Sequence, residues 1–329
     1  MKHVILPVFV PHMGCPHTCV FCNQFRITGT WEPPDLATLA CQAEEWAASS
    51  GTLPELAFYG GSFTAIDLKT QTALLESAAQ LKKDGRISRV RLSTRPDALD
   101  AEVLARLAHY GVDTVEIGVQ SLDDEVLAAS QRGHTAAQAE DAIRRVQAAG
   151  FRCGAQMMVA LPGDTPEKSL ATGARLVQLA PDMVRIYPTA VIRDTALAEA
   201  YAAGSYQPWP LDAVLDTVAA LLDLFDAAEI PVIRVGLQAE DNLSQGDVIA
   251  GAYHPALGEL VKARRFRRRM AALLREHETA PVQFAVAPRF LSQAIGQHRE
   301  NLHYLSERCG QPVTVVADAS VLNDTVERM

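Results

Sequence analysis

Three cysteines lie within eight residues near the start of this chain, and only three more follow in the rest of the sequence. Cys15, Cys19 and Cys22 have the spacing C-x3-C-x2-C, which lets three thiolates of a turn-rich loop converge on one metal centre. Structural zinc sites use four protein ligands, and iron–sulfur clusters normally take four cysteines. Three cysteines with no fourth at matching spacing would leave one iron open to an outside ligand, and this favours a site for chemistry over a scaffold.

A zinc site is the main competing interpretation of this loop, because His12 or His17 could supply the fourth ligand. Three incidental buried cysteines would be the plainest interpretation, but cysteine is rare elsewhere in the chain. Cys41 and Cys153 fall in a predicted helix and a predicted strand and are expected to be core residues. Cys309 receives no role from the sequence.

The composition is that of an ordinary soluble globular chain, with 48% hydrophobic, 21% charged and 6% aromatic residues among 329. This length suits one large domain or two smaller ones. No apolar run approaches the ~20 residues that span a bilayer. The opening MKHVILPVFVP lacks a small-residue cleavage site, so it is predicted to be a strand and the protein to be cytoplasmic. In a reducing compartment, clustered cysteines are more often metal ligands than disulfides.

Regular alternation of strand-like and helix-like segments must position these cysteines. Six strand–helix units in succession predict parallel strands with right-handed crossovers, and hence an α/β fold, either a barrel or a doubly wound sheet. The predicted strands are residues 3–10, 55–61, 89–94, 112–120, 151–163 and 182–190, and the predicted helices are 34–49, 68–83, 100–111, 136–150 and 167–180. After about residue 242 the rhythm weakens, and a helix at 256–277, a strand at 281–287, a helical stretch at 291–310 and a strand at 312–318 are expected. The prediction is therefore a partial (β/α)6 barrel over residues 1–240 and a small C-terminal α/β segment over 241–329.

Unusual residues follow the ends of the predicted strands. The cysteine loop follows the first strand, Gly60, Gly61 and Ser62 follow the second, and STRPD ends and follows the third. Gln120 ends the fourth strand, and LPGDT follows the fifth. In a barrel these loops share the carboxyl-terminal face, where active sites are built.

The cysteine motif, with the aromatic Phe21 directly before its last cysteine, resembles that of the radical S-adenosylmethionine (radical SAM) superfamily. The segments FYGGSFTAI, VEIGVQSLDDEVLAASQRGHT and IYPTAVIRDTALAEAYAAGSYQPW narrow the resemblance, which covers about residues 4–240. They are similar to the branch that contains the Elongator catalytic subunit, a tRNA wobble-uridine modifier, and the oxygen-independent coproporphyrinogen oxidases, in a short bacterial form. The Elongator subunit spaces its cysteines more widely and adds an acetyltransferase domain. No glycine-rich acetyl-coenzyme A loop follows Asp241 here, so acetyl transfer is not expected.

The resemblance implies a [4Fe-4S] cluster on Cys15, Cys19 and Cys22, with S-adenosylmethionine on the open iron. Reductive cleavage of S-adenosylmethionine would then yield a 5′-deoxyadenosyl radical that abstracts a substrate hydrogen. The resemblance also implies that the residues contacting S-adenosylmethionine are Phe21, Gly60, Gly61, Ser62, Ser93, Gln120 and Arg132. Ser62 replaces the usual glutamate, Gln120 could bridge ribose hydroxyls, and the Arg132 guanidinium could pair with the methionine carboxylate. Each could equally have a structural role, and the two glycines could mark a plain tight turn.

Three functions stay open: a radical SAM enzyme acting on RNA such as tRNA, a radical SAM enzyme acting on a small porphyrin-precursor-like molecule, and a non-catalytic zinc or iron–sulfur module. Either enzyme would need a one-electron donor such as flavodoxin or ferredoxin. The candidate substrate contacts are Tyr187, Arg185, Arg193, Arg234 and His254.

RNA binding would require a local basic patch, because the net charge of the chain is −9. The segment VKARRFRRRM supplies one candidate patch, made of Lys262, Arg264, Arg265, Arg267, Arg268 and Arg269. Apolar residues recur through this segment at helical spacing, so one face is expected to pack while the arginines fan over the rest. The same pattern fits a solvated helix paired with nearby acids such as Glu259 and Glu276.

Overall fold

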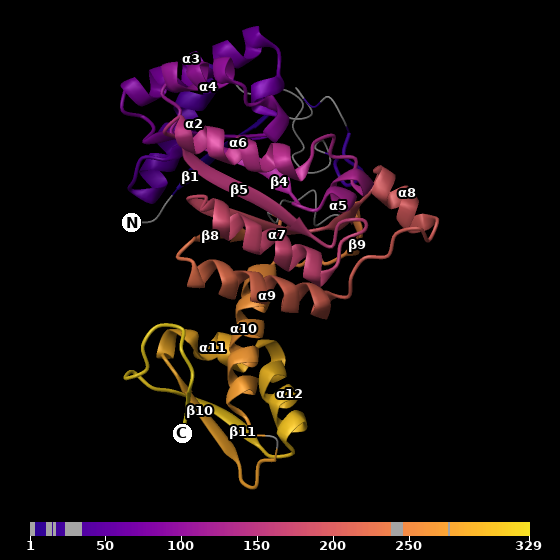
Figure 1. Ribbon diagram of the computed structural model, residues 1–329. Coiled ribbons are helices and arrows are strands. Elements are labelled where there is room, and N and C mark those ends of the chain that lie inside the picture. The colour runs from indigo at the N-terminus through magenta and orange to yellow at the C-terminus, as the bar shows by residue number, and fades with distance from the viewer. Residues whose placement is uncertain (1–3, 11–14, 16–17, 24–34, 238–245, 276) are drawn as a thin grey trace.

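Seven parallel strands form one curved sheet, a half-barrel in which the strands follow one another in chain order, except that the short strand β7 (Ala190–Ile192) is skipped between the last two (Figure 1). The computed structural model describes residues 4–10, 15, 18–23, 35–237, 246–275 and 277–329. The strands, in sheet order, are β1 (Ile5–Val10), β2 (Glu55–Gly60), β3 (Arg89–Thr94), β4 (Thr114–Gln120), β5 (Arg152–Val159), β6 (Met183–Pro188) and β8 (Val232–Val235). The predicted partial barrel is therefore confirmed, with β8 as a seventh strand that the sequence analysis did not anticipate.

Helices cover the outer face of this sheet (Figure 1). They are α2 (Leu36–Ser50), α3 (Leu68–Lys83), α4 (Ala101–His109), α5 (Asp124–Ala129), α6 (Ala136–Ala148), α7 (Pro166–Leu179) and α9 (Leu211–Ala227). A further helix, α8 (Ala196–Ala202), lies to one side and packs on Val20, Val191 and Tyr206. Several start where an aspartate or threonine side chain accepts a hydrogen bond from the first-turn backbone, as Asp35 does from the Thr38 N–H of α2. Thr135 and Gln138 form a reciprocal capping box at the start of α6. These caps explain why the helix starts could be read from the sequence.

Side chains that alternate along the strands face either the hydrophobic core beneath the helices or a cavity inside the half-barrel. In β1, Leu6 and Val8 are buried in the main hydrophobic core beneath the helices, whereas Pro7 and Phe9 line a cavity inside the half-barrel. β3 repeats the pattern, with Leu92 in the core and Ser93 at the cavity. Because side chains of a strand alternate between its two faces, the inner face is free to carry polar and functional groups while the outer face packs.

The cysteines outside the motif do not all behave as predicted. Cys153 is fully buried in β5, as expected. Cys41 is exposed, and its thiol donates to Glu45 over 3.7 Å, so its assignment to the core is wrong. The reason is helical phase: α2 buries Leu39 and Ala43, and the residue midway between them faces the opposite side. Cys309 is buried in a second, smaller core.

That smaller core belongs to the C-terminal part of the chain. Its elements are α10 (Leu257–Leu273), β10 (Val282–Val286), α11 (Leu291–Ile295), α12 (Glu300–Cys309), β11 (Val313–Ala317) and β12 (Glu327–Arg328). β10 pairs in parallel with β11 and in antiparallel with β12, and β7 (Ala190–Ile192) pairs separately with β9 (Val248–Gly251). α10 packs along α9, and α11 and α12 pack against α10 in turn. The predicted boundary between residues 240 and 241 lies outside the described residues. Within the described residues, no helix is long and apolar enough to cross a membrane.

Candidate functional site

A small cavity of about 90 Å3 lies at the carboxyl ends of β2 to β5. All three motif cysteines line it, and the predicted contacts from the strand ends line the same space. The lining residues are Cys15, Thr18, Cys19, Cys22, Gly60, Gly61, Ser62, Ser93, Thr94, Arg95, Gly118, Gln120, Arg132 and Gln156. Residues far apart in the sequence thus meet at one point, as expected for the carboxyl-terminal face of a barrel.

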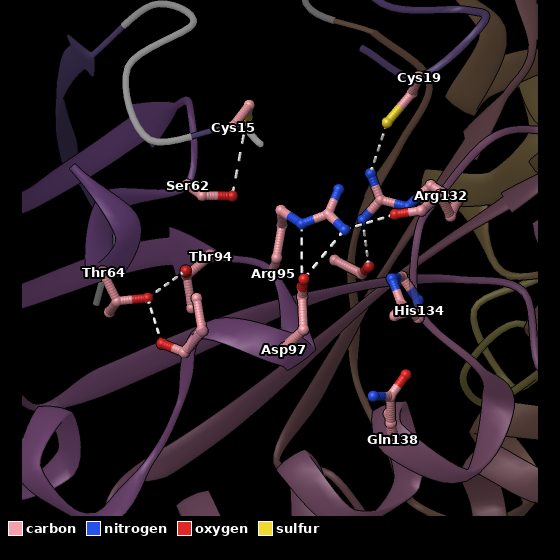
Figure 2. Close-up of polar contacts among 12 residues, drawn as sticks. Cys15, Cys19, Ser62, Thr64, Thr94, Arg95, Asp97, Arg132, His134 and Gln138 are labelled. Atoms are coloured by element: carbon pink, nitrogen blue, oxygen red, sulfur yellow. Dashed lines mark hydrogen bonds and ion pairs between the residues drawn. The ribbon is translucent and has the colours of Figure 1, made fainter. Parts of the chain in front are cut away.

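Arg132 lies between α5 and α6 and is 6% exposed. Its Nη1 donates to Cys19 Sγ over 3.0 Å, and its Nη2 donates to the Gly118 carbonyl over 2.7 Å (Figure 2). Its buried Nε has no hydrogen-bond partner, and no described carboxylate forms an ion pair with it. The guanidinium therefore places a positive charge in the cavity, directly beside a motif cysteine.

Arg95 was missed by the sequence analysis, although it lies in the STRPD segment. It is 3% exposed, and its Nε and Nη2 donate to the two Asp97 carboxylate oxygens over 2.9 and 3.2 Å. Its Nη2 also donates to the Arg132 backbone carbonyl, and both arginines line the small cavity (Figure 2). The signal that could have found it is the arginine directly after the strand end, since residues at that position face the carboxyl-terminal mouth.

Backbone geometry at the end of β4 is unusual. Gln120 has φ of 64°, in the left-handed region that few residues other than glycine adopt, and the β4–β5 register shifts between Gly118 and Gln120. Its buried Oε1 has no hydrogen-bond partner among the described residues. A side chain at position 118 would place Cβ 3.0 Å from Gln120 Nε2 and 3.2 Å from Arg132 Nη2, so only glycine leaves both groups their present positions. Strain of this kind, about 1–3 kcal/mol, is often found at binding sites.

The second strand end meets the cysteine loop. The Cys15 thiol donates to Ser62 Oγ over 3.7 Å (Figure 2), and Ser62 is 2% exposed. Gly60 has φ of 104°, and a Cβ there would lie 3.3 Å from the Val10 backbone. Below them, Thr64 bridges the Thr94 hydroxyl and the Ala98 carbonyl, which ties the second strand end to the third.

His134 lies behind Arg132 and is 6% exposed. Its Nε2 lies 3.3 Å from the Val119 carbonyl. Burial, and then the charge of Arg132, lower the pKa of His134 to about 4, so it is neutral at physiological pH.

Comparisons with known proteins agree with this geometry. The family model for the radical SAM superfamily matches residues 9–172, and the model for the Radical_SAM C-terminal domain matches residues 181–267. Together they cover most of the chain. The chain belongs to the radical SAM superfamily.

The radical SAM relatives include a tRNA uridine(34) acetyltransferase of Dehalococcoides mccartyi, which is 24% identical over 283 residues, 73% of this chain and 62% of the relative. Elongator complex protein 3 of Danio rerio is 32% identical over 178 residues, 53% of this chain and 32% of the relative. The chain thus spans about three fifths of the first relative and about a third of the second. Among solved structures, Elp3 of Methanocaldococcus infernus has a TM-score of 0.64 at 20% identity, with 83% of this chain and 63% of that chain covered. Coproporphyrinogen III oxidase of Escherichia coli has a TM-score of 0.50 at 20% identity, with 69% and 53% covered. At these identities the structures show a shared fold.

Membership in the radical SAM superfamily implies a [4Fe-4S] cluster and S-adenosylmethionine as cofactors. The residues of the small cavity fit these groups. Three thiols provide the sulfur donors, Arg132 provides an uncompensated positive charge for a carboxylate, and the buried Gln120 Oε1 and Arg132 Nε are left without partners. Unlike a single ion, a four-iron cluster holds each thiolate on a different iron, so thiols placed around a cavity suit it. Among the described residues, no group of three cysteine, histidine, aspartate or glutamate side chains could hold a single metal ion. His12 and His17, the alternative zinc ligands, lie outside the described residues.

A larger cavity of about 370 Å3 adjoins the small one inside the half-barrel, and Cys22, Gly60, Ser93 and Gln156 line both. Phe21, predicted to contact S-adenosylmethionine, lines this larger cavity and not the small one. Of the candidate substrate contacts, Tyr187, Arg185 and Arg234 line the larger cavity. Arg193 and His254 lie outside its lining.

The predicted basic patch on α10 is largely neutralised in the structure. Arg264 pairs with Asp212 and Asp216 of α9, Arg265 pairs with Asp223 and Asp226, Arg269 pairs with Asp324 and Asp223, and Lys262 pairs with Glu259. The aspartates come mainly from α9, a source that sequence spacing could not reveal. Of the other acids named for this role, Glu276 lies outside the described residues. Arg267 stacks on Tyr304 at 4.3 Å, and within the part of the chain that the structure describes Arg268 donates to the Asp216 carbonyl alone.

Proposed function

We propose that the small cavity holds the [4Fe-4S] cluster on Cys15, Cys19 and Cys22, with S-adenosylmethionine beside it, and that the substrate occupies the larger cavity. The observation that carries this proposal is the shared wall: Cys22, Gly60, Ser93 and Gln156 line both cavities. A radical formed in one space is therefore next to whatever occupies the other.

The chemistry supplied by the two cofactors is a 5′-deoxyadenosyl radical that abstracts hydrogen. This chain's own residues bind, orient and shield. Arg132 offers a planar pair of N–H donors to the methionine carboxylate, and Ser62 offers a hydroxyl acceptor to the amino group. Gly60 and Gly61 allow a ligand to approach the backbone closely. Cys15, Thr18, Cys19 and Cys22 form part of the wall of the site.

Dithionite reduction of cluster-loaded protein tests this proposal. With S-adenosylmethionine and no substrate, the parent protein should slowly release 5′-deoxyadenosine. Cys19→Ser should release none, because it removes a cluster ligand, whereas the matched control Cys41→Ser should behave as the parent, since Cys41 lies on the exposed face of α2. A parent protein that carries its cluster and releases no 5′-deoxyadenosine would contradict the proposal.

We infer that the substrate is an RNA. Two observations support this: the radical SAM relatives named above include a tRNA uridine(34) acetyltransferase, and a groove of about 540 Å3 lies between α9, α10 and α12. Its lining residues are Asp212, Asp216, Arg264, Arg267, Arg268, Ala271, Ala272, Tyr304 and Arg308. Four arginines and two aspartates leave a net charge of about +2 in the groove, where the guanidinium of Arg267 stacks on Tyr304, a ring that is 40% exposed.

The groove lies at the mouth end of the half-barrel. In a strand–helix–strand unit the helix begins at the carboxyl end of the preceding strand, so the first turns of α9 lie at the end of the sheet where the small cavity opens. Asp212 and Asp216, in those first turns, line the groove. An RNA strand held by its phosphates in the groove would therefore lie beside the carboxyl-terminal end of the half-barrel.

A tRNA-binding measurement tests this inference. Arg267, Arg268 and Arg308 carry the charge that no described carboxylate neutralises by an ion pair. Reversing all three to Glu should abolish tRNA binding and leave uncoupled cleavage of S-adenosylmethionine intact. Reversing Lys83, Arg144 and Arg152, which lie on the helical side of the half-barrel or at the amino end of β5, should leave binding unchanged. Binding by the parent should weaken steeply with salt, by a log–log slope of about 0.7–0.9 per phosphate contact. Absent or salt-insensitive tRNA binding would favour a small-molecule substrate instead.

A further inference from the structure

One arginine on the wall of the larger cavity has no acidic partner among the described residues. Arg234 of β8 lines the cavity, and its strand position is paired with Arg185 of β6. Its Nε donates to the Gly236 carbonyl over 3.1 Å, and this is its one hydrogen bond within the described part of the chain. Its two terminal amino groups remain available.

The other charged side chains at the larger cavity cancel with their partners. Arg91 pairs with Glu55 at 2.8 Å and also with Glu116, and Arg185 pairs with Glu116 at 2.7 Å. Two buried arginines and two buried glutamates thus form a neutral network across β2, β3, β4 and β6. Arg234 therefore leaves a net positive charge at the cavity, and that charge favours an anion.

Tyr59 adds a hydrogen-bond donor close to the small cavity. Its hydroxyl accepts a hydrogen bond from Arg185 Nη2 over 2.6 Å, so its own proton is free to be donated elsewhere. Burial, and then the charge of Glu116, raise the pKa of Tyr59, so the phenol stays protonated. Tyr59 directly precedes Gly60, which lines both cavities.

The remaining wall is mostly apolar or aromatic. Besides the polar groups, the cavity is lined by Ile5, Pro7, Phe9, Phe21, Trp46, Met158, Tyr187, Pro188, Ala190, Ile192 and Leu237. Such walls suit a flat, apolar ligand body, and a few placed polar groups then fix its orientation.

We propose that the larger cavity binds a planar, apolar group that carries an anion, either a carboxylate or a phosphate, with the anion on Arg234 and a neutral oxygen of the ligand on Tyr59. The role of this ligand as the substrate rests on the proposed function, but its recognition does not. The two anion sources share the same chemistry at a guanidinium, which donates two parallel N–H bonds to either oxygen pair.

Calorimetric titration with three matched probes tests the proposal: 2-naphthoate, 2-naphthyl phosphate and 2-naphthol. The parent protein should bind at least one of the anions more tightly than the neutral naphthol, and the preferred anion identifies the source. Arg234→Gln should weaken the binding of that anion by about 10- to 150-fold, because it removes a charge-assisted hydrogen bond, and should leave naphthol binding unchanged. Arg234→Lys should keep a preference for the anion. The matched control is Arg193→Gln, because Arg193 also donates to a backbone carbonyl but lies outside the cavity lining.

Equal binding of the anions and naphthol by the parent would overturn the proposal, as would undiminished anion binding by Arg234→Gln. Circular dichroism of each variant checks that it is folded, and Arg234→Lys carries the test if Arg234→Gln is not. Failure of the proposed function is distinguished by a separate measurement on the parent protein. If the parent releases no 5′-deoxyadenosine while Arg234→Gln still weakens anion binding, the anion site is supported and the proposed radical chemistry is contradicted.

Discussion

Replacing Arg132 by methionine removes one positive charge from the small cavity and keeps most of the side-chain length. In the structure the guanidinium donates to Cys19 Sγ over 3.0 Å and to the Gly118 carbonyl over 2.7 Å, and no described carboxylate pairs with it. The substitution therefore leaves no buried charge without its partner, and its main cost should fall on ligand binding. A charge-assisted hydrogen bond to the carboxylate of S-adenosylmethionine contributes about 1.5–3 kcal/mol, so Arg132→Met should weaken binding by about 10- to 150-fold.

Equilibrium binding of S-adenosylmethionine to cluster-loaded protein measures this effect. Arg132→Lys keeps the charge without the planar fork and should fall between the parent and Arg132→Met. Arg144→Met is the matched control, because Arg144 is an exposed arginine on α6. Parent-like affinity in Arg132→Met would refute the role of Arg132, and an equal loss in Arg144→Met would show that the effect does not arise in the cavity.

Three further predictions follow from the geometry of the half-barrel. Glu116→Ala leaves the buried Arg185 guanidinium without a carboxylate and leaves Arg91 with Glu55 alone, so it should lower the free energy of unfolding by about 3–5 kcal/mol in urea titrations, against about 1 kcal/mol or less for the half-buried Glu140→Ala; equal losses would contradict this. The pKa of His134 is about 4 in the native state and about 6.5 in the unfolded state, so below pH 6.5 only the unfolded state takes up a proton on this imidazole. Between pH 7 and pH 5 the free energy of unfolding of the parent should therefore fall by about 2 kcal/mol more than that of His134→Asn. Gly118→Ala crowds the glutamine and arginine side chains at 3.0 and 3.2 Å and should weaken S-adenosylmethionine binding several-fold, whereas Gly258→Ala, whose Cβ would have ordinary contacts, should not.

Periodicity and capping made the half-barrel predictable from the sequence. The predicted segments 68–83 and 89–94 coincide with α3 and β3, because the N-cap Asp67 and the apolar alternation are local signals. β8 was missed since it is only four residues long, and none of its residues is fully buried. Cys41 was wrongly assigned to the core because the residue type alone does not tell which face of the helix points inward.

The site was predictable only where a motif marks it. The cysteines, the strand-end residues Ser62 and Gln120, and Arg132 from the α5–α6 loop meet at one cavity, as local motifs suggested, although their roles toward the cofactors stay predictions. The neutralisation of the α10 arginines could not be foreseen, because Asp212 and Asp223 lie about 40 to 50 residues away and approach only through helix packing. The polar network inside the half-barrel was likewise invisible, since its four charges come from four different strands.

The iron and sulfide content of anaerobically reconstituted protein tests the central claim most directly. The account predicts about four iron and four sulfide per chain in the parent and in Cys41→Ser, and loss of the cluster in Cys15→Ser, Cys19→Ser and Cys22→Ser alike. Stoichiometric zinc without iron in the parent, or a full cluster retained by any of the three serine variants, would contradict it.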